Sequence, residues 1–260
     1  MRVATTTGLR AQCELLRSLH RRGDPLVLPN AWDVATAKAV VSAGYPVVAT
    51  TSWAVAAALG YEDGERAPAD EMLAAVARIA RGVDVPMTVD VEAGYGMQPA
   101  ELVEALHDAG AAGCNLEDTE WPAGSLRDPD RHAEWLTAVR EAASGAGYPL
   151  VINARIDVFF HPFLADESGP QEGFVAEAVR RGKAYLDAGV DCVYPICLWE
   201  ATPLRRFMSK VAGSVNIACE PQAPSIAELS ELGVARVSWG PLLQWDMMAR
   251  FQDQLASLRG

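Results

Sequence analysis

Met87-Thr88-Val89-Asp90-Val91-Glu92-Ala93-Gly94-Tyr95-Gly96 begins as an apolar strand and ends in a glycine turn. Asp90 and Glu92 are two residues apart, so the strand period places both carboxylates on the same face. Two acidic side chains at the end of an apolar strand are costly unless a cation meets them. The stretch predicts a hard divalent cation at this strand end, and the open alternative is a solvated acidic strand end.

The same unit of apolar strand, polar loop and alanine-rich helix recurs on both sides of this stretch. Alternation of this kind without a linker or composition break predicts one (β/α)₈ barrel domain over residues 1–260. A doubly wound open sheet is the alternative, but its usual GxGxxG turn after the first strand is absent from the sequence. The expected strands are 26–29, 47–51, 87–92, 113–118, 150–157, 192–197, 214–220 and 235–240. The expected helices are 8–22, 33–43, 69–81, 99–109, 129–143, 171–188, 203–211, 225–232 and 241–258.

Composition excludes several classes of function. The chain has 260 residues, 50% of them hydrophobic, and a formal net charge of −12. An acidic protein is not attracted to nucleic acid or to anionic membranes, and no apolar run is long enough to span a bilayer. The N-terminal stretch lacks the apolar core of a signal peptide. The five cysteines have no CxxC spacing, so we expect reduced core residues in a cytoplasmic protein.

Chemistry in such a barrel lies at the carboxyl ends of the strands. Polar residues recur there within otherwise apolar strands, which predicts a site rather than chance placement. Asn115 and Asn153 would orient a ligand or satisfy polar atoms of the barrel. The side chains delivered to this end include Asn30, Thr51, Ser52, Trp53, Asp63, Asp90, Glu92, Asn115, Glu117, Asp118, Asn153, Arg155, Asp157 and Glu220.

Four of these residues are oxygen donors with no histidine or thiol beside them: Asp63, Asp90, Glu92 and Glu117. Carboxylate-rich ligation suits Mg²⁺, or Mn²⁺ as the alternative, and argues against zinc. Mg²⁺ keeps several waters, so only one or two carboxylates need to touch it. We expect Asp90 to contact the ion directly and the other three to hold its waters.

Arg155 is predicted to bind the carboxylate of a small organic acid through paired hydrogen bonds. The alternative is an internal ion pair with Asp157 or with a barrel carboxylate. Thr51 and Ser52 would offer hydroxyl and backbone N–H groups to the same acid, or serve only as turn residues.

A divalent cation and a carboxylate-binding arginine suit one type of reaction. A 2-oxo acid chelates the cation, which stabilises the enolate formed when the adjacent bond breaks. Nucleophilic catalysis is disfavoured because there is no GxSxG and none of the four histidines matches an expected strand end. His20, His107, His132 and His161 are expected to be surface or hydrogen-bonded residues.

The motifs together resemble the isocitrate lyase/phosphoenolpyruvate mutase superfamily over nearly the whole chain. The resemblance implies a (β/α)₈ barrel, Mg²⁺, a small 2-oxo or hydroxy acid substrate, and a homo-oligomer, dimer or tetramer, that exchanges its last helix between subunits. By position, Asp63, Asp90, Glu92 and Glu117 match the metal-site carboxylates, while Arg155 and the segment Thr51-Ser52-Trp53 match the substrate-carboxylate site. The motifs that carry it are Pro29-Asn30-Ala31-Trp32-Asp33, Thr50-Thr51-Ser52, Gly60-Tyr61-Glu62-Asp63-Gly64-Glu65, Asp90-Val91-Glu92-Ala93-Gly94-Tyr95-Gly96, Gly113-Cys114-Asn115-Leu116-Glu117-Asp118 and Asn153-Ala154-Arg155-Ile156-Asp157.

Two departures separate the chain from the lyases of this superfamily. Their mobile loop after the fourth strand carries a cysteine, whereas residues 119–128 here contain none. The lyases also have a glutamate where Ile196 follows Pro195. The chain therefore resembles the mutase-like branch that lacks the lid cysteine.

The expected function is that of a Mg²⁺-dependent lyase that makes or breaks a C–C bond next to the carbonyl of a small 2-oxo acid. Its expected catalytic residues are Asp90, Glu117 and Arg155. The general acid or base stays open, with Tyr61, Glu120 and Arg127 as candidates. The alternatives are phosphonopyruvate mutase or hydrolase chemistry, and a non-catalytic protein that binds 2-oxo acids.

Overall fold

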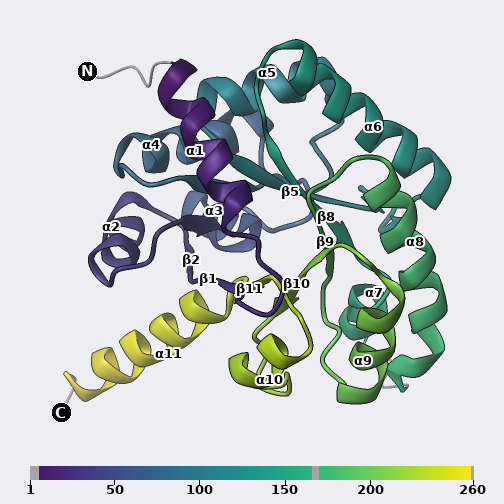
Figure 1. Cartoon of the computed structure of the whole chain (residues 1–260). Coiled ribbons are helices and arrows are strands. Elements are labelled where there is room, and N and C mark those ends of the chain that lie inside the picture. The colour runs from purple at the N-terminus through teal and green to yellow at the C-terminus, as the bar shows by residue number, and fades with distance from the viewer. Residues whose placement is uncertain (1–5, 166–169, 259–260) are drawn as a thin grey trace.

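A barrel of parallel strands is the central feature of the computed structural model, which describes residues 6–165 and 170–258 (Figure 1). The strands are β1 (Leu26–Leu28), β2 (Asn30–Ala31), β3 (Val48–Thr50), β4 (Met87–Asp90), β5 (Gly113–Glu117), β8 (Val151–Ile156), β9 (Cys192–Pro195), β10 (Ser214–Ala218) and β11 (Arg236–Ser238). They lie in the order β1-β11-β10-β9-β8-β5-β4-β3-β2. Because β1 pairs with β11 and β2 pairs with β3, the two ends of the sheet meet at Pro29. The predicted barrel is confirmed.

Helices connect the strands and cover the outside of the barrel (Figure 1). Four glycines that follow helices have φ between 77° and 91°, the left-handed conformation in which glycine ends a helix without strain. These glycines are Gly44, Gly110, Gly189 and Gly233. The helices are α1 (Thr6–Ser18), α2 (Val34–Ser42), α3 (Ser52–Leu59), α4 (Ala69–Arg81), α5 (Pro99–Ala109), α6 (Pro129–Gly145), α7 (Phe160–Leu164), α8 (Val175–Asp187), α9 (Ala201–Lys210), α10 (Ile226–Glu231) and α11 (Leu242–Ser257), with a 3₁₀ turn at Gln171–Phe174.

Helix α1 covers the amino end of the barrel, opposite the strand ends where chemistry is expected. Arg17 donates hydrogen bonds to the carbonyls of Pro149 and Leu150 and to Asp191, just before β8 and β9. Cys13 and Leu16 of α1 are fully buried. This end of the barrel is therefore filled by packed side chains.

Three elements differ from the sequence expectation. Helix α3 begins directly after β3, where a loop was expected, because its alanine-rich residues pack Val55 and Ala56 against Met72. The expected loop 119–128 contains a hairpin of β6 (Thr119–Glu120) and β7 (Ser125–Leu126). Helix α7 was missed because five residues are too few to show a helical period.

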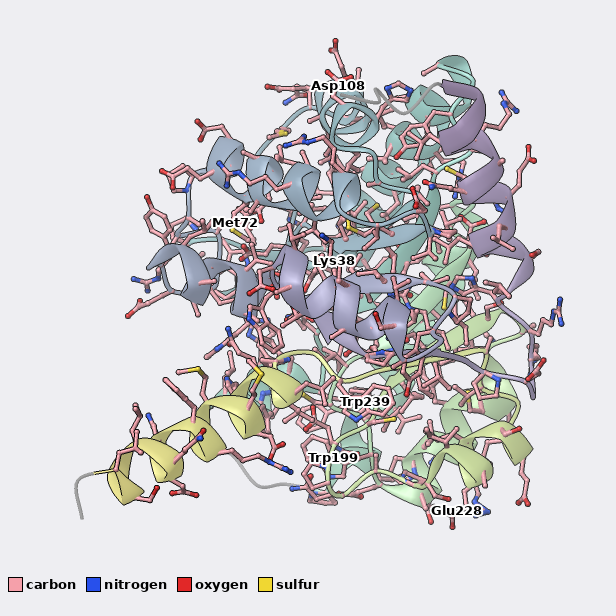
Figure 2. All side chains as sticks on the ribbon, turned by 90° about the vertical axis from the view of Figure 1, so that its left-hand side faces the viewer. Lys38, Met72, Asp108, Trp199, Glu228 and Trp239 are labelled. Carbon is pink, nitrogen blue, oxygen red and sulfur yellow. The ribbon has the colours of Figure 1, made fainter. Side chains whose placement is uncertain are left out.

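Helix α11 projects away from the barrel (Figures 1 and 2). Five of its apolar side chains are between 44% and 51% exposed: Trp245, Met247, Met248, Phe251 and Leu255. Exchange of this helix between subunits, which the resemblance implied, stays a prediction because the structure describes a single chain.

Replacing Gly113 by alanine should destabilise the protein. A Cβ there would lie 2.8 Å from Leu16 Cδ2 and 2.8 Å from the Val151 carbonyl oxygen, so β5 or α1 must shift. We expect a loss of about 1–3 kcal/mol in the free energy of unfolding, measured by urea denaturation. The control is Gly145→Ala at the end of α6, where a Cβ meets nothing within 4 Å. Equal effects of the two substitutions would contradict this packing.

Candidate active site

A cavity of about 120 Å³ opens at the carboxyl end of the barrel strands. Polar residues at the ends of β2 to β8 form one side of it, and apolar residues from α7, the β9 end and α11 form the other. Asp90 and Arg155 both line this cavity, as expected if they belong to one site. The lining residues are Asn30, Thr51, Ser52, Trp53, Asp63, Asp90, Asn115, Arg155, Phe160, Phe163, Leu164, Tyr194, Ile196, Cys197, Glu220, Ser238, Gly240, Pro241, Leu242 and Trp245.

Asp63 and Asp90 line this cavity, and each has a buried carboxylate oxygen. Asp90 Oδ2 accepts hydrogen bonds from the backbone N–H and hydroxyl of Ser52, at 3.1 and 3.0 Å. Oδ1 of Asp90 and Oδ1 of Asp63 have no hydrogen-bond partner among the described residues. Burial, and then the charge of Asp90, raise the pKa of Asp63 to about 6. These oxygens fit a hard divalent cation, because a bound cation would supply the partner that each lacks.

The described residues contain no group of three or more His, Cys, Asp or Glu side chains that could hold a metal ion by themselves. A Mg²⁺ ion does not require one, since it usually takes one or two carboxylates and completes its shell with waters and substrate oxygens. The pair of Asp63 and Asp90 meets that requirement.

Glu92 holds the loop that carries Asp63. Its Oε2 accepts hydrogen bonds from the backbone N–H groups of Gly64, at 2.8 Å, and Glu65, and its Oε1 accepts one from the Tyr95 hydroxyl at 3.2 Å. Glu65, Glu92 and Tyr95 have φ of 55°, 49° and 53°, which is strained for residues with a side chain. Such strain persists only where the surroundings impose it, so this contact positions Asp63.

Arg155 is buried and forms ion pairs with two carboxylates. Its NH1 lies 2.7 Å from Glu117 Oε2, and its Nε lies 2.6 Å from Asp157 Oδ1. NH2 donates to the second oxygen of Asp157, and the guanidinium lies 4.6 Å from the ring centre of Phe160. Three of the five guanidinium N–H groups are therefore used, and the other two have no partner in the described part of the chain. The internal ion pair and a carboxylate-binding role are compatible.

Glu117 points at Arg155 and not at the cavity. It also accepts a hydrogen bond from Trp121 Nε1 at 2.6 Å. The ring of Trp121 packs over Gly64, where an added Cβ would lie 3.2 Å from it. The hairpin thus joins Glu117 to the loop that carries Asp63. Burial raises the pKa of Glu117, and the charge of Arg155 opposes that shift.

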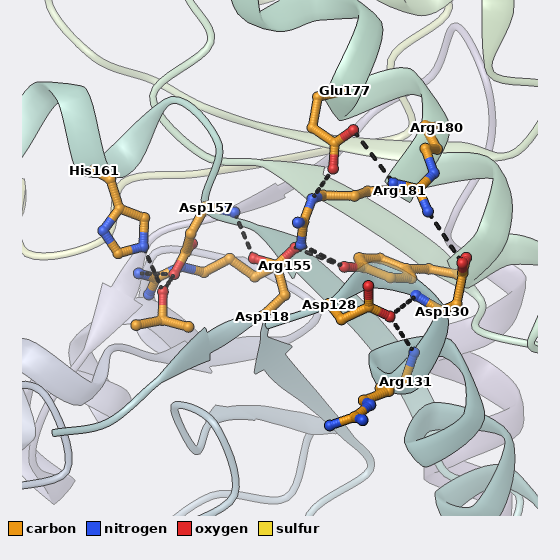
Figure 3. Close-up of polar contacts among 12 residues, drawn as sticks. Asp118, Asp128, Asp130, Arg131, Arg155, Asp157, His161, Glu177, Arg180 and Arg181 are labelled. Atoms are coloured by element: carbon orange, nitrogen blue, oxygen red, sulfur yellow. Dashed lines mark hydrogen bonds and ion pairs between the residues drawn. The ribbon is translucent and has the colours of Figure 1, made fainter. Parts of the chain in front are cut away.

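Figure 3 shows a second charged cluster outside the barrel wall, behind Arg155. Asp118 accepts hydrogen bonds from Arg181 and Tyr185 of α8 at 2.8 and 2.7 Å, and from the backbone N–H of Asp157 at 2.8 Å. Asp118 therefore faces α8 and fixes the backbone that places Asp157. The buried Thr119 hydroxyl donates to Asp157 and lies 3.0 Å from His161 Nε2.

The barrel interior below the cavity is polar. Asn115 Oδ1 accepts hydrogen bonds from Asn153 at 2.9 Å and from Arg236 at 3.1 Å. Arg236 is 1% exposed and does not line the cavity, and no sequence signal had marked it. Asn153 is fully buried, so its contact with Asn115 positions a residue that does line the cavity.

Nine of the fourteen side chains that the sequence placed at this end of the barrel line the cavity, and five do not. The five are Glu92, Glu117, Asp118, Asn153 and Asp157; the nine are Asn30, Thr51, Ser52, Trp53, Asp63, Asp90, Asn115, Arg155 and Glu220. The candidate acids and bases lie elsewhere: the Tyr61 hydroxyl donates to Glu71 at 2.9 Å, and Glu120 and Arg127 line a separate cavity. All five cysteines are free, and Cys197, with φ of 62°, is the one that reaches the active-site cavity among the lining residues. The catalytic and metal roles stay predictions.

The separate cavity lies beside the hairpin, and His132, which lines it, differs from the sequence expectation. His132 is 1% exposed and lines this cavity, but neither ring nitrogen has a partner among the described residues. Its ring stacks on Trp135 and meets Tyr185 edge-on. The expectation of a surface or hydrogen-bonded side chain is wrong for His132. Sequence could not show it, because burial of one helix face depends on the neighbouring helix.

Comparison with known proteins agrees with this architecture. The family model described as Phosphoenolpyruvate phosphomutase matches residues 16–259. The chain belongs to the isocitrate lyase/phosphoenolpyruvate mutase superfamily. Enzymes of this superfamily use a divalent metal and act on small acids.

Three similar proteins illustrate the range of the superfamily. An uncharacterized Mycobacterium tuberculosis protein is 33% identical over 85% of this chain and 80% of its own length. A probable 2-methylisocitrate lyase of Corynebacterium glutamicum is 29% identical over 84% of this chain and 66% of the lyase. A crystal structure of a putative phosphonomutase from Burkholderia cenocepacia is 39% identical, with a TM-score of 0.87 over 94% of this chain and 99% of that one. Within the described residues, no helix has the length and hydropathy needed to cross a bilayer.

His132 should make the protein acid-sensitive. Burial lowers the pKa of His132 to about 3, whereas an unfolded histidine titrates near 6.5. A lowered folded pKa means that this contribution to stability is complete above pH 6.5 and is lost as the pH falls toward 3. His132→Phe should therefore gain about 1–3 kcal/mol relative to wild type between pH 7 and pH 4, measured by urea denaturation. The control is His107→Phe at a half-exposed site, and a parallel pH profile for both variants would refute the assignment.

Proposed function

We propose that this chain is a Mg²⁺-dependent lyase that makes or breaks a C–C bond next to the carbonyl of a small 2-oxo acid. One observation carries the proposal. The partnerless oxygens of Asp63 and Asp90 and the two partnerless N–H groups of Arg155 belong to side chains that line the same cavity. A cation and a guanidinium on one cavity match the two ends of a 2-oxo acid, its keto oxygen and its carboxylate.

Asp90 and Asp63 would hold the cation. When bound there, a divalent cation supplies charge stabilisation for the oxygen that becomes negative as the bond breaks. Ser52 fixes the orientation of Asp90 through its two hydrogen bonds, and Glu92 fixes the loop of Asp63. The protein's own contribution is to hold both carboxylates in place before substrate arrives.

Arg155 would orient the substrate carboxylate. Glu117 and Asp157 use its other N–H groups and keep its plane fixed, so little side-chain entropy is lost on binding. The first turn of α3 begins at Ser52 on the same side of the cavity, and its N-terminus favours an anionic group nearby. The apolar residues opposite would limit the access of water to the reacting atoms.

Two other functions remain to be separated from this one. Phosphonopyruvate mutase or hydrolase chemistry is supported by the family description and by the similar phosphonomutase structure. A phosphonate carries additional negative charge, but among the described residues Arg155 is the only cationic side chain that lines the cavity. A non-catalytic protein that binds 2-oxo acids would keep the same site without turnover.

Turnover with Mg²⁺ should distinguish these functions. We expect keto-acid release from a panel of oxaloacetate, isocitrate, methylisocitrate and phosphonopyruvate. At least one of the first three, which have no C–P bond, should be a substrate. Asp90→Ala should lower that rate by about a hundredfold or more, since it removes a predicted cation ligand. Asp84→Ala, at an exposed aspartate just before β4, is the control.

Activity on phosphonopyruvate alone would support the P–C alternative. Saturable oxalate binding without any turnover would support the binding protein. Equal turnover and equal oxalate binding by Asp90→Ala and wild type would show that the cation assignment is wrong.

A further inference from the structure

One ionisable side chain of the cavity is used neither by the pair Asp63 and Asp90 nor by Arg155. Glu220 follows β10, is half-buried and lines the cavity. Its backbone carbonyl accepts a hydrogen bond from the N–H of Ala223 at 2.9 Å, so the chain turns sharply there. Its carboxylate has no hydrogen bond or ion pair among the described residues, and burial raises its pKa. A carboxylate in this condition is free to exchange a proton with a bound molecule.

The strand order places Glu220 across the barrel from Asp90. Asp90 ends β4 and Glu220 follows β10. Going one way around the barrel, β5, β8 and β9 lie between these two strands; going the other way, β3, the β1–β2 segment and β11 lie between them. The two carboxylates therefore belong to opposite walls of one cavity. A substrate whose oxygens are held on the β4 side extends its remaining carbons toward the β10 side.

The other five ionisable side chains that line the cavity cannot act as a base near neutral pH. Asp63 and Asp90 would be occupied by the cation. Arg155 is paired with two carboxylates and stays protonated. Burial raises the pKa of the Tyr194 hydroxyl and of the Cys197 thiol well above their ordinary values, so neither forms its anion readily. Among the described residues that line the cavity, this leaves the carboxylate that follows β10.

We propose that Glu220 is the catalytic general acid and base of this site, which moves one proton between the two fragments of the substrate. The proposal rests on the proposed function, because Asp63, Asp90 and Arg155 define how the substrate is held. It supplies the proton transfer that the residues named from sequence, Tyr61, Glu120 and Arg127, lie too far from the cavity to perform.

The step balances with the groups present. In cleavage, the Glu220 carboxylate takes the proton from a substrate hydroxyl, and that fragment leaves with a new C=O bond. The electron pair of the broken C–C bond stays on carbon in the other fragment as an enolate. Glu220, now a carboxylic acid, gives the same proton to that carbon. Bond formation is the reverse, in which Glu220 removes a proton from the carbon next to the carbonyl.

A partial reaction tests this role without knowledge of the full substrate. Pyruvate is the smallest 2-oxo acid with C–H bonds next to its carbonyl. With Mg²⁺ in D₂O, we expect the full-length protein to exchange the pyruvate methyl protons for deuterium faster than a protein-free sample, followed by proton NMR. Glu220→Gln should slow this exchange by about a hundredfold or more, because the amide cannot accept the proton. Its affinity for oxalate, measured by isothermal titration with Mg²⁺, should stay within about twofold of wild type, since oxalate has no proton to transfer.

The matched control is Glu231→Gln, at an exposed glutamate that ends α10 and does not line the cavity. It should exchange pyruvate protons and bind oxalate as wild type does. Glu220→Ala provides a second variant without the carboxylate and should behave as Glu220→Gln does.

The outcomes distinguish this role from the proposed function. Exchange at the wild-type rate in Glu220→Gln, or oxalate binding by wild type without any exchange of pyruvate protons, would overturn the role of Glu220 and leave the cation and carboxylate site standing. Loss of oxalate binding in both Glu220 variants would assign the residue a structural role and also overturn the proposal. If wild type neither binds oxalate nor exchanges pyruvate protons, the proposed function is overturned as well.

Discussion

The mouth of this barrel contains more buried carboxylates than nearby cations, and the arrangement of the site depends on this constraint. Glu117 and Asp157 share the one guanidinium of Arg155 at 2.7 and 2.6 Å, which leaves Asp63 and Asp90 without a cation among the described residues. Buried charges of one sign are costly unless they are protonated, hydrogen-bonded or bound to a metal. Burial, and then the charge of Asp90, raise the pKa of Asp63, which is consistent with a carboxylate that lacks a nearby cation.

The surrounding structure holds this imbalance in place. Glu92 is committed to the backbone N–H groups of the loop that carries Asp63, and three residues there adopt left-handed backbone conformations. Asp118 accepts hydrogen bonds from Arg181 and Tyr185, and it also accepts one from the backbone N–H of Asp157, which it holds from outside the barrel. The site is therefore arranged before ligand binds, which is what electrostatic catalysis requires of a protein.

The polar side of the site could be predicted from sequence because it follows strand period and strand ends. Asp90, Asn115 and Arg155 alternate with apolar residues, so their common direction needs no knowledge of neighbouring elements. The apolar side of the cavity could not be predicted in this way. Helix α7 is too short for a periodic signal. Trp245 lies in the first turn of α11, and its contact with the cavity depends on where that helix begins after the last strand.

The sequence also could not distinguish residues that line the cavity from residues that position them. Glu92 and Glu117 follow strands as Asp90 does, yet the oxygens of Glu92 accept hydrogen bonds from a loop and those of Glu117 contact the guanidinium of Arg155. His161 follows β8 on the unpredicted helix α7, where it contacts Thr119. Only the pairing of β5 with β8 brings these segments together.

Binding of Mn²⁺, followed by electron paramagnetic resonance, tests most directly whether Asp63 and Asp90 hold a divalent cation. We expect about one ion bound per chain, displaced by Mg²⁺, and at least roughly tenfold weaker binding in Asp63→Asn and in Asp90→Asn, since each loses a carboxylate ligand. Asp84→Asn should bind as wild type does. Absence of Mn²⁺ binding to wild type, or unchanged binding in both site variants, would contradict it.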